Sequence, residues 1–119
     1  MAKILLVDDA EFVRMKARKI LLEAGYSDIA EASNGQDAIE QYNLYRPDLV
    51  MLDITMPVKD GLTALRELKQ LDPQAKVVMV SAIGQKATVL EAIKAGASDF
   101  VLKPYDPEKL VAAVKKQVG

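Results

Sequence analysis

The chain has 119 residues, of which 50% are hydrophobic, and its acidic and basic residues balance to a formal net charge of −1. This balance argues against a general binder of nucleic acid or of membrane surfaces. Cysteine and histidine are both absent, which excludes a disulfide framework, a serine–histidine catalytic pair and a zinc site of the usual kind. No apolar run approaches the roughly 20 residues that span a bilayer. We therefore expect one cytoplasmic globular domain.

Short apolar runs alternate along the chain with segments of helical periodicity. In chain order, strands are predicted at 4–7, 28–32, 49–52, 77–80 and 100–102. Helices are predicted after them at 12–24, 35–45, 62–71, 85–95 and 107–118. The segment 28–32 is the least apolar of the five strands, which is typical of an edge position. The other four runs are continuously apolar, which predicts strands that are covered on both faces.

The five strand–helix repeats predict an α/β fold. Right-handed crossovers place helices on both faces of a parallel sheet, which gives a doubly wound (βα)5 architecture. All strands of such a sheet end at the same edge, and ligands bind there, in the crevice where the strand order reverses. The order 2-1-3-4-5 would place the first and third strands side by side at that point.

Four of the predicted strands run into polar residues that can carry chemistry. The first is followed by Asp8 and Asp9, the third by Asp53, the fourth by Ser81 and the fifth by Lys103. Because the strand ends converge, we expect one site with three carboxylates, a hydroxyl and an ammonium group. Blander interpretations remain open for single residues: the aspartate pair and Ser81 each suit a helix N-cap, and Lys103 suits a solvated surface position.

The combination of these groups indicates metal-dependent phosphoryl transfer. Crowded carboxylates repel one another, and oxygen-only ligands suit Mg²⁺, with Mn²⁺ as the alternative. An aspartate can accept a phosphoryl group as an acyl phosphate, and Asp53 is the candidate because it is central among the strand ends. Lys103 would neutralise a phosphoryl oxygen, and Ser81 would donate a hydrogen bond to the same group.

The same residues form a set of motifs that runs through the chain. These are Asp8-Asp9, Asp53-x-x-Met56-Pro57-x-x-Asp60-Gly61, Ser81-Ala82, Ala95-Gly96-Ala97 and Lys103-Pro104. In this order and spacing they resemble the response-regulator receiver domains of two-component signalling. The resemblance covers essentially the whole chain and is strongest to stand-alone chemotaxis regulators. It implies a flavodoxin-like fold with strand order 2-1-3-4-5, and a single receiver domain over 1–119 without an output domain.

The resemblance also implies how the metal and the phosphoryl group are bound. Asp53 would be the phospho-acceptor. Asp9, Asp53 and the backbone carbonyl of Thr55 would bind Mg²⁺ directly, while Asp8 would act through a metal-bound water. Lys103 would contact a phosphoryl oxygen, and its peptide bond to the following proline would be cis.

Two further residues are implied in the conformational switch. The Ser81 hydroxyl would move towards the phosphoryl group. Phe100 stands at the position of a switch aromatic, although an ordinary core residue is equally expected in this apolar strand. The readout would take place on the face formed by the penultimate helix, the fifth strand and the last helix.

The implied function is that of a signalling switch rather than an enzyme, apart from the catalysis of its own phosphorylation and dephosphorylation. A histidine kinase would supply the phosphoryl group to a monomeric protein, and a downstream protein, such as the flagellar motor switch, would read it. No nucleic acid or membrane is expected as a partner. A phosphorelay intermediate, a receiver of a larger transcriptional regulator, a small aspartate-nucleophile phosphatase and an FMN carrier remain as alternatives.

Overall fold

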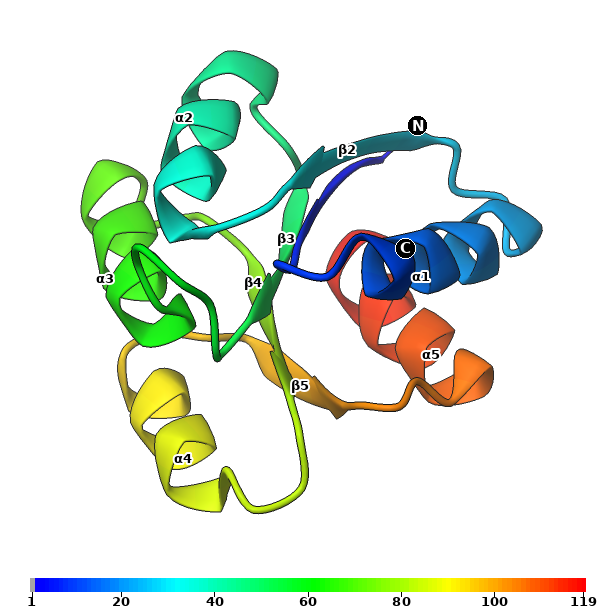
Figure 1. Cartoon of the computed structure of the whole chain (residues 1–119). Coiled ribbons are helices and arrows are strands. Elements are labelled where there is room, and N and C mark those ends of the chain that lie inside the picture. Colours follow the sequence, from blue (N-terminus) through cyan, green and yellow to red (C-terminus); the bar gives the residue numbers. More distant parts are fainter. Residues whose placement is uncertain (1) are drawn as a thin grey trace.

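Five parallel strands alternate with five helices over residues 2–119, the part of the chain that the computed structural model describes (Figure 1). The strands are β1 (Lys3–Val7), β2 (Asp28–Ala32), β3 (Leu49–Asp53), β4 (Val77–Ser81) and β5 (Asp99–Leu102). The helices are α1 (Glu11–Glu23), α2 (Gly35–Tyr45), α3 (Gly61–Leu71), α4 (Lys86–Lys94) and α5 (Pro107–Val118). Every predicted element is confirmed, with ends that differ by at most one residue.

The sheet has the strand order β2-β1-β3-β4-β5, which confirms the predicted doubly wound topology. Helices α1 and α5 cover one face of the sheet, and α2, α3 and α4 cover the other (Figure 1). The register pairs Val7 with Leu52, Asp53 with Val80, and Ser81 with Leu102. The ends of these four strands therefore lie side by side along one edge.

The three central strands carry the core. Apart from Lys3, every residue of β1, β3 and β4 is buried, and their apolar side chains pack into one hydrophobic cluster on each face of the sheet. Strand β2 lies at one edge, as its weaker hydrophobicity predicts. Over residues 2–119, no helix is both long enough and apolar enough to span a membrane.

Strand β5 departs from its prediction. Val101 is buried, but Phe100 and Leu102 are 42% and 50% exposed. The strand lies at the second edge of the sheet, and both exposed side chains line grooves that continue onto α4 and α5. The expectation of cover on both faces is therefore wrong for β5, an edge strand whose outer side pairs with no further strand within residues 2–119.

Helix α4 is the second element that leaves apolar side chains exposed. Val89 and Ala92 are buried, whereas Leu90 and Ile93 are 54% and 42% exposed. Small and branched side chains make the contact with the sheet, and the larger ones point outwards. Together with the open side of β5, this leaves apolar side chains exposed along two neighbouring elements.

Gly61 fixes the loop after β3 against the end of that strand. Its N–H donates to the carbonyl of Ile54 at 2.8 Å, and the side chain of the preceding Asp60 caps α3 by accepting the N–H of Thr63 at 2.8 Å. A Cβ atom at Gly61 would lie 2.1 Å from the carbonyl oxygen of Asp53, so only glycine fits here. The Asp60-Gly61 pair thus sets where α3 begins relative to Asp53.

We expect the substitution Gly61→Ala to lower the free energy of unfolding by about 2 kcal/mol, because the added methyl group forces apart two backbone segments at the strand end. Urea denaturation measures this change. Gly25→Ala is a comparison without a steric clash: no atom lies within 4 Å of its added Cβ, and its φ of +96° adds a backbone cost that Gly61 does not have. A Gly61→Ala variant as stable as the wild type would show that the loop relaxes freely.

Candidate functional site

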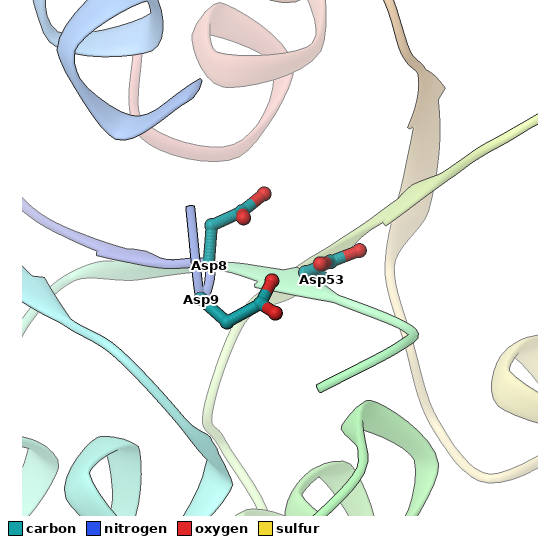
Figure 2. A group of neighbouring side chains, drawn as sticks. All are labelled: Asp8, Asp9 and Asp53. Atoms are coloured by element: carbon teal, nitrogen blue, oxygen red, sulfur yellow. The ribbon is translucent and has the colours of Figure 1, made fainter. Parts of the chain in front are cut away.

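Three carboxylates meet at the edge of the sheet where β1 and β3 end (Figure 2). Asp8 and Asp9 directly follow β1, and Asp53 is the last residue of β3. One oxygen from each of the three lies within 4.8 Å of the others. Asp8 and Asp53 are buried, and Asp9 is exposed at the mouth of the group. The predicted convergence of these three residues is confirmed.

Lys103 lies between the two buried carboxylates. Its Nζ is 2.7 Å from Oδ2 of Asp8 and 3.1 Å from Oδ2 of Asp53. Its backbone N–H donates to the carbonyl of Ser81 at 2.8 Å, which continues the pairing of β4 and β5 beyond the sheet. The peptide bond from Lys103 to Pro104 is cis, as expected. The alternative of a solvated surface lysine does not hold.

Burial and charge set the ionisation of the buried pair. Burial, and then the negative charge of Asp8, raise the pKa of Asp53, and the contact with Lys103 only partly offsets them. For Lys103, burial acts to lower the pKa, but the hydrogen bond to Asp8 and the charge of Asp53 outweigh it, so that the pKa is raised. The lysine therefore stays charged while Asp53 is less acidic than an exposed aspartate.

Ser81 is buried at the end of β4, and its Oγ has no hydrogen-bond partner within residues 2–119. It does not cap α4, which begins at Lys86 without any side-chain cap. The N-cap position of α1 is Ala10, so neither aspartate of the first pair caps that helix from the usual position, although Asp8 Oδ1 accepts the N–H of Ala10 at 2.9 Å.

The other two predicted residues lie on either side of this group. Thr55 is exposed in the loop after β3, and its backbone hydrogen-bonds to the carboxylate of Asp53. Phe100 lies on the open side of β5, outside the hydrophobic core. An ordinary core position for Phe100 is thereby excluded, and its aromatic ring borders the grooves next to α4 and α5.

Three residues next to the site could not be predicted from the sequence pattern. Arg14 on α1 donates to the backbone carbonyl of Asp8 and pairs with Glu31 at 2.8 Å. Tyr105 lies close enough that burial, and then the charges of Asp8 and Asp53, raise the pKa of its hydroxyl. Gln85 bonds to Thr55 at 2.7 Å. Each depends on contacts made in the folded structure, which periodicity does not report.

The chemistry of the group fits a hard divalent cation. Oxygen ligands in a close group of carboxylates suit Mg²⁺, and a cation would offset both the burial and the charge of Asp8, which raise the pKa of Asp53. Asp9 is exposed, so one ligand already faces the solvent from which an ion would enter. Within residues 2–119, Lys103 is the one cationic side chain that forms salt bridges with this group, through Asp8 and Asp53.

Comparison with known proteins identifies the family. Residues 4–115 match the response regulator receiver domain. The chain belongs to this family. Acceptance of a phosphoryl group and binding of Mg²⁺ are general properties of its members, and the resemblance described from the sequence motifs is confirmed.

The relatives of the chain include chemotaxis receivers that match it from end to end. It is 50% identical over 117 residues to the chemotaxis protein CheY of Bacillus subtilis, with 98% of each chain covered. It is 48% identical over 114 residues to CheY of Thermotoga maritima, covering 96% of this chain and 95% of that one. The receiver domain of NtrX from Brucella abortus has the same fold, with a TM-score of 0.92, 34% identity and 98% of both chains covered.

A further solved structure shares the fold and contains a metal. It is the CheX–CheY–BeF3–Mg²⁺ complex from Borrelia burgdorferi, with a TM-score of 0.90 and 36% identity over 97% of this chain and 87% of that one. The receiver family therefore includes a member in which Mg²⁺ accompanies a fluoride complex of beryllium. The present chain has a group of three carboxylates whose spacing suits a metal ion.

We expect Asp53→Asn to stabilise the Mg²⁺-free protein at pH 7. The folded-state pKa of Asp53 is raised, so the charged side chain costs stability above that pKa. Between the pKa of Asp53 in the unfolded state and its higher pKa in the folded state, the folded state binds more protons than the unfolded state. The stability cost of the charged side chain therefore disappears as the pH falls through the folded-state pKa towards the unfolded-state pKa. Urea denaturation in EDTA at several pH values gives the difference between variant and wild type.

The stabilisation by Asp53→Asn should thus shrink at acidic pH. The control is Glu40→Gln, which removes a negative charge from an exposed position on α2, away from the carboxylate group. A similar pH-dependent gain in Glu40→Gln would point to general charge repulsion and contradict a local cause at Asp53.

Proposed function

We propose that this protein is a signalling switch whose Asp53 takes a phosphoryl group from a histidine kinase in the presence of Mg²⁺. The observation that carries the proposal is the position of Asp53: a buried carboxylate at the central strand end, 3.1 Å from the ammonium of Lys103 and next to two further acids. Family membership supports the same reaction, because phosphoryl transfer to an aspartate is general among receivers.

The transfer moves one phosphoryl group between two side chains. A carboxylate oxygen of Asp53 attacks the phosphorus, a P–O bond forms, and the P–N bond to the phosphohistidine of the kinase breaks. The released imidazole keeps the bonding electron pair and takes up a proton from water. The signal ends by hydrolysis: the oxygen of a water bonds to the phosphorus, the P–O bond to Asp53 breaks, the carboxylate of Asp53 is restored on the protein, and inorganic phosphate and a proton are released.

The residues around Asp53 have complementary roles in this proposal. Asp9, Asp53 and the backbone carbonyl of Thr55 would hold Mg²⁺ directly, with Asp8 acting through a water. When bound, the ion neutralises part of the charge on the transferred group. Lys103 stays protonated and contacts a phosphoryl oxygen, a role supported by its present contacts with two carboxylates.

Ser81 and Phe100 would couple the phosphoryl group to a partner-binding surface. The Ser81 hydroxyl is buried and without a partner among the described residues, so it is available as a donor. Phe100 lies on the open side of β5, where apolar side chains of β5 and α4 are exposed together. We propose that this α4–β5–α5 face binds the downstream protein and changes when Asp53 is phosphorylated.

The physiological setting that we propose is bacterial chemotaxis. It rests on full-length similarity to CheY proteins of several organisms. The partners would be a chemotaxis histidine kinase and the flagellar motor switch, and the protein would act in the cytoplasm as a monomer. The small charge imbalance of −1 gives no reason to add nucleic acid or a membrane surface as a partner.

Incubation with acetyl phosphate should add one phosphoryl group to the wild-type protein in the presence of Mg²⁺, and none to Asp53→Asn. The acyl phosphate is labile to base, so the added mass should disappear at alkaline pH. Intact-protein mass spectrometry measures both. Omission of Mg²⁺ should reduce labelling strongly, because the new group adds about −1.5 to −2 charge beside two acids.

Labelling stoichiometry, together with the turnover of an added phosphoester, separates a switch from a phosphatase. A switch accumulates one phosphoryl group per chain, whereas a phosphatase turns over an added phosphoester many times. Labelling that persists in Asp53→Asn would show that another residue is the acceptor, and absence of labelling in the wild type despite Mg²⁺ binding would contradict the proposed chemistry.

A further inference from the structure

Gln85 connects the two loops that flank the site. Its Oε1 accepts the N–H of Ala82 at 2.7 Å, and its Nε2 donates to Oγ1 of Thr55 at 2.7 Å. Thr55 lies two residues after Asp53, and Ala82 directly follows Ser81. One side chain, the Gln85 bridge, thus joins the segment after β4 to the segment after β3.

The segment that the Gln85 bridge holds has few other contacts. Ala82, Ile83 and Gly84 are all exposed, and Gly84 has a φ of +93°, in the left-handed region. Gln85 occupies the N-cap position of α4, yet its side chain makes no cap for that helix. Since exposed segments with few packed neighbours open easily, two well-formed hydrogen bonds matter for where this one lies.

Ser81, directly before the exposed segment 82–84, has a hydroxyl group without a hydrogen-bond partner within residues 2–119. Its hydroxyl is buried and bonds to no group within residues 2–119, so it is not within hydrogen-bond distance of the Asp53 carboxylate. A buried hydroxyl gains free energy when it finds an acceptor, and a phosphoryl oxygen on Asp53 would be one. Ser81 approaches that oxygen by moving towards β3, and Ala82 moves with it, away from its present bond to Gln85.

We propose that Gln85 is a positioning residue that favours the unphosphorylated state, and that its bonds to Ala82 and Thr55 are given up when Asp53 is phosphorylated. The inference rests on the proposed function of Asp53. A neutral hydrogen bond within a protein makes a modest net contribution to stability. Loss of the bridge should therefore favour the switched state by roughly 2- to 10-fold.

The test uses beryllofluoride with Mg²⁺ as a stable mimic of the phosphoryl group. Gln85→Met keeps the length of the side chain and removes both hydrogen bonds. Calorimetric titration should show that this variant binds beryllofluoride roughly 2- to 10-fold more tightly than the wild type at saturating Mg²⁺. Its affinity for Mg²⁺ alone should be unchanged, because the hydrogen bonds of the Gln85 side chain go to the N–H of Ala82 and the hydroxyl of Thr55, and neither the three carboxylates nor the carbonyl of Thr55 receives one.

Two further variants separate the bridge from a general effect. Gln70→Met makes the same change at an exposed position of α3 and should leave the affinity for beryllofluoride unchanged. Thr55→Val removes the hydroxyl that receives the Gln85 amide and keeps the backbone carbonyl, so it should tighten binding by part of the Gln85→Met effect. Asp53→Asn should abolish binding of beryllofluoride in all backgrounds.

The amide resonance of Ala82 gives a readout that loss of stability alone would not produce. In the wild type it should shift on addition of beryllofluoride and Mg²⁺, and in free Gln85→Met it should already lie part of the way towards the bound position. Wild-type binding with equal or weaker binding by Gln85→Met would overturn the role of Gln85 and leave the function of Asp53 intact. A wild type that does not bind beryllofluoride with Mg²⁺ would overturn both.

Discussion

The ammonium group of Lys103 between two buried carboxylates is the interaction on which the site depends. Carboxylates as close as those of Asp8 and Asp53 destabilise each other when both are ionised and desolvated, unless a cation lies between them. Asp8 directly follows β1, Asp53 ends β3, and the lysine follows β5. This balance of charge is therefore reached only when strands from distant parts of the chain end at one edge, so the topology of the sheet is a condition for the site.

One lysine leaves the group of acids incompletely neutralised. When Asp8, Asp9 and Asp53 are all ionised, negative charge exceeds positive charge in the site, and a divalent cation matches the excess. In the proposed function, phosphorylation of Asp53 would add further negative charge at the same place, and Lys103 together with the metal ion would offset it. Burial, and then the negative charge of Asp8, raise the pKa of Asp53 in the protein without a metal ion, so a cation bound beside this carboxylate would favour its ionised form.

The residues that the sequence could predict are those whose position follows from the ends of apolar strands. Asp8, Asp53 and Lys103 each follow such a run, and a parallel sheet brings them together whatever their loops do. The prediction that both faces are covered was wrong for β5. Phe100 and Leu102 are apolar, and an apolar residue type does not show whether its side chain packs in the core or lies exposed at an edge strand. Leu90 and Ile93 on α4 are likewise apolar and yet exposed. Helical spacing places them on a helix but does not decide which side packs on the sheet.

Gln85 was beyond prediction for a different reason, since its two bonds depend on how the loops after β3 and β4 meet in space. A glutamine in a polar turn ordinarily points to a solvated side chain. Its position also links the two halves of the proposed mechanism, because α4 begins at the next residue and carries Leu90 and Ile93 on its exposed side. The short segment from Ala82 to Gln85 directly follows Ser81 of the site and directly precedes α4, which carries the exposed apolar side chains. In the proposed mechanism, a displacement of Ala82 would therefore shift the first turn of α4. The phosphoryl group would be connected with that face through this short segment and not through the hydrophobic core.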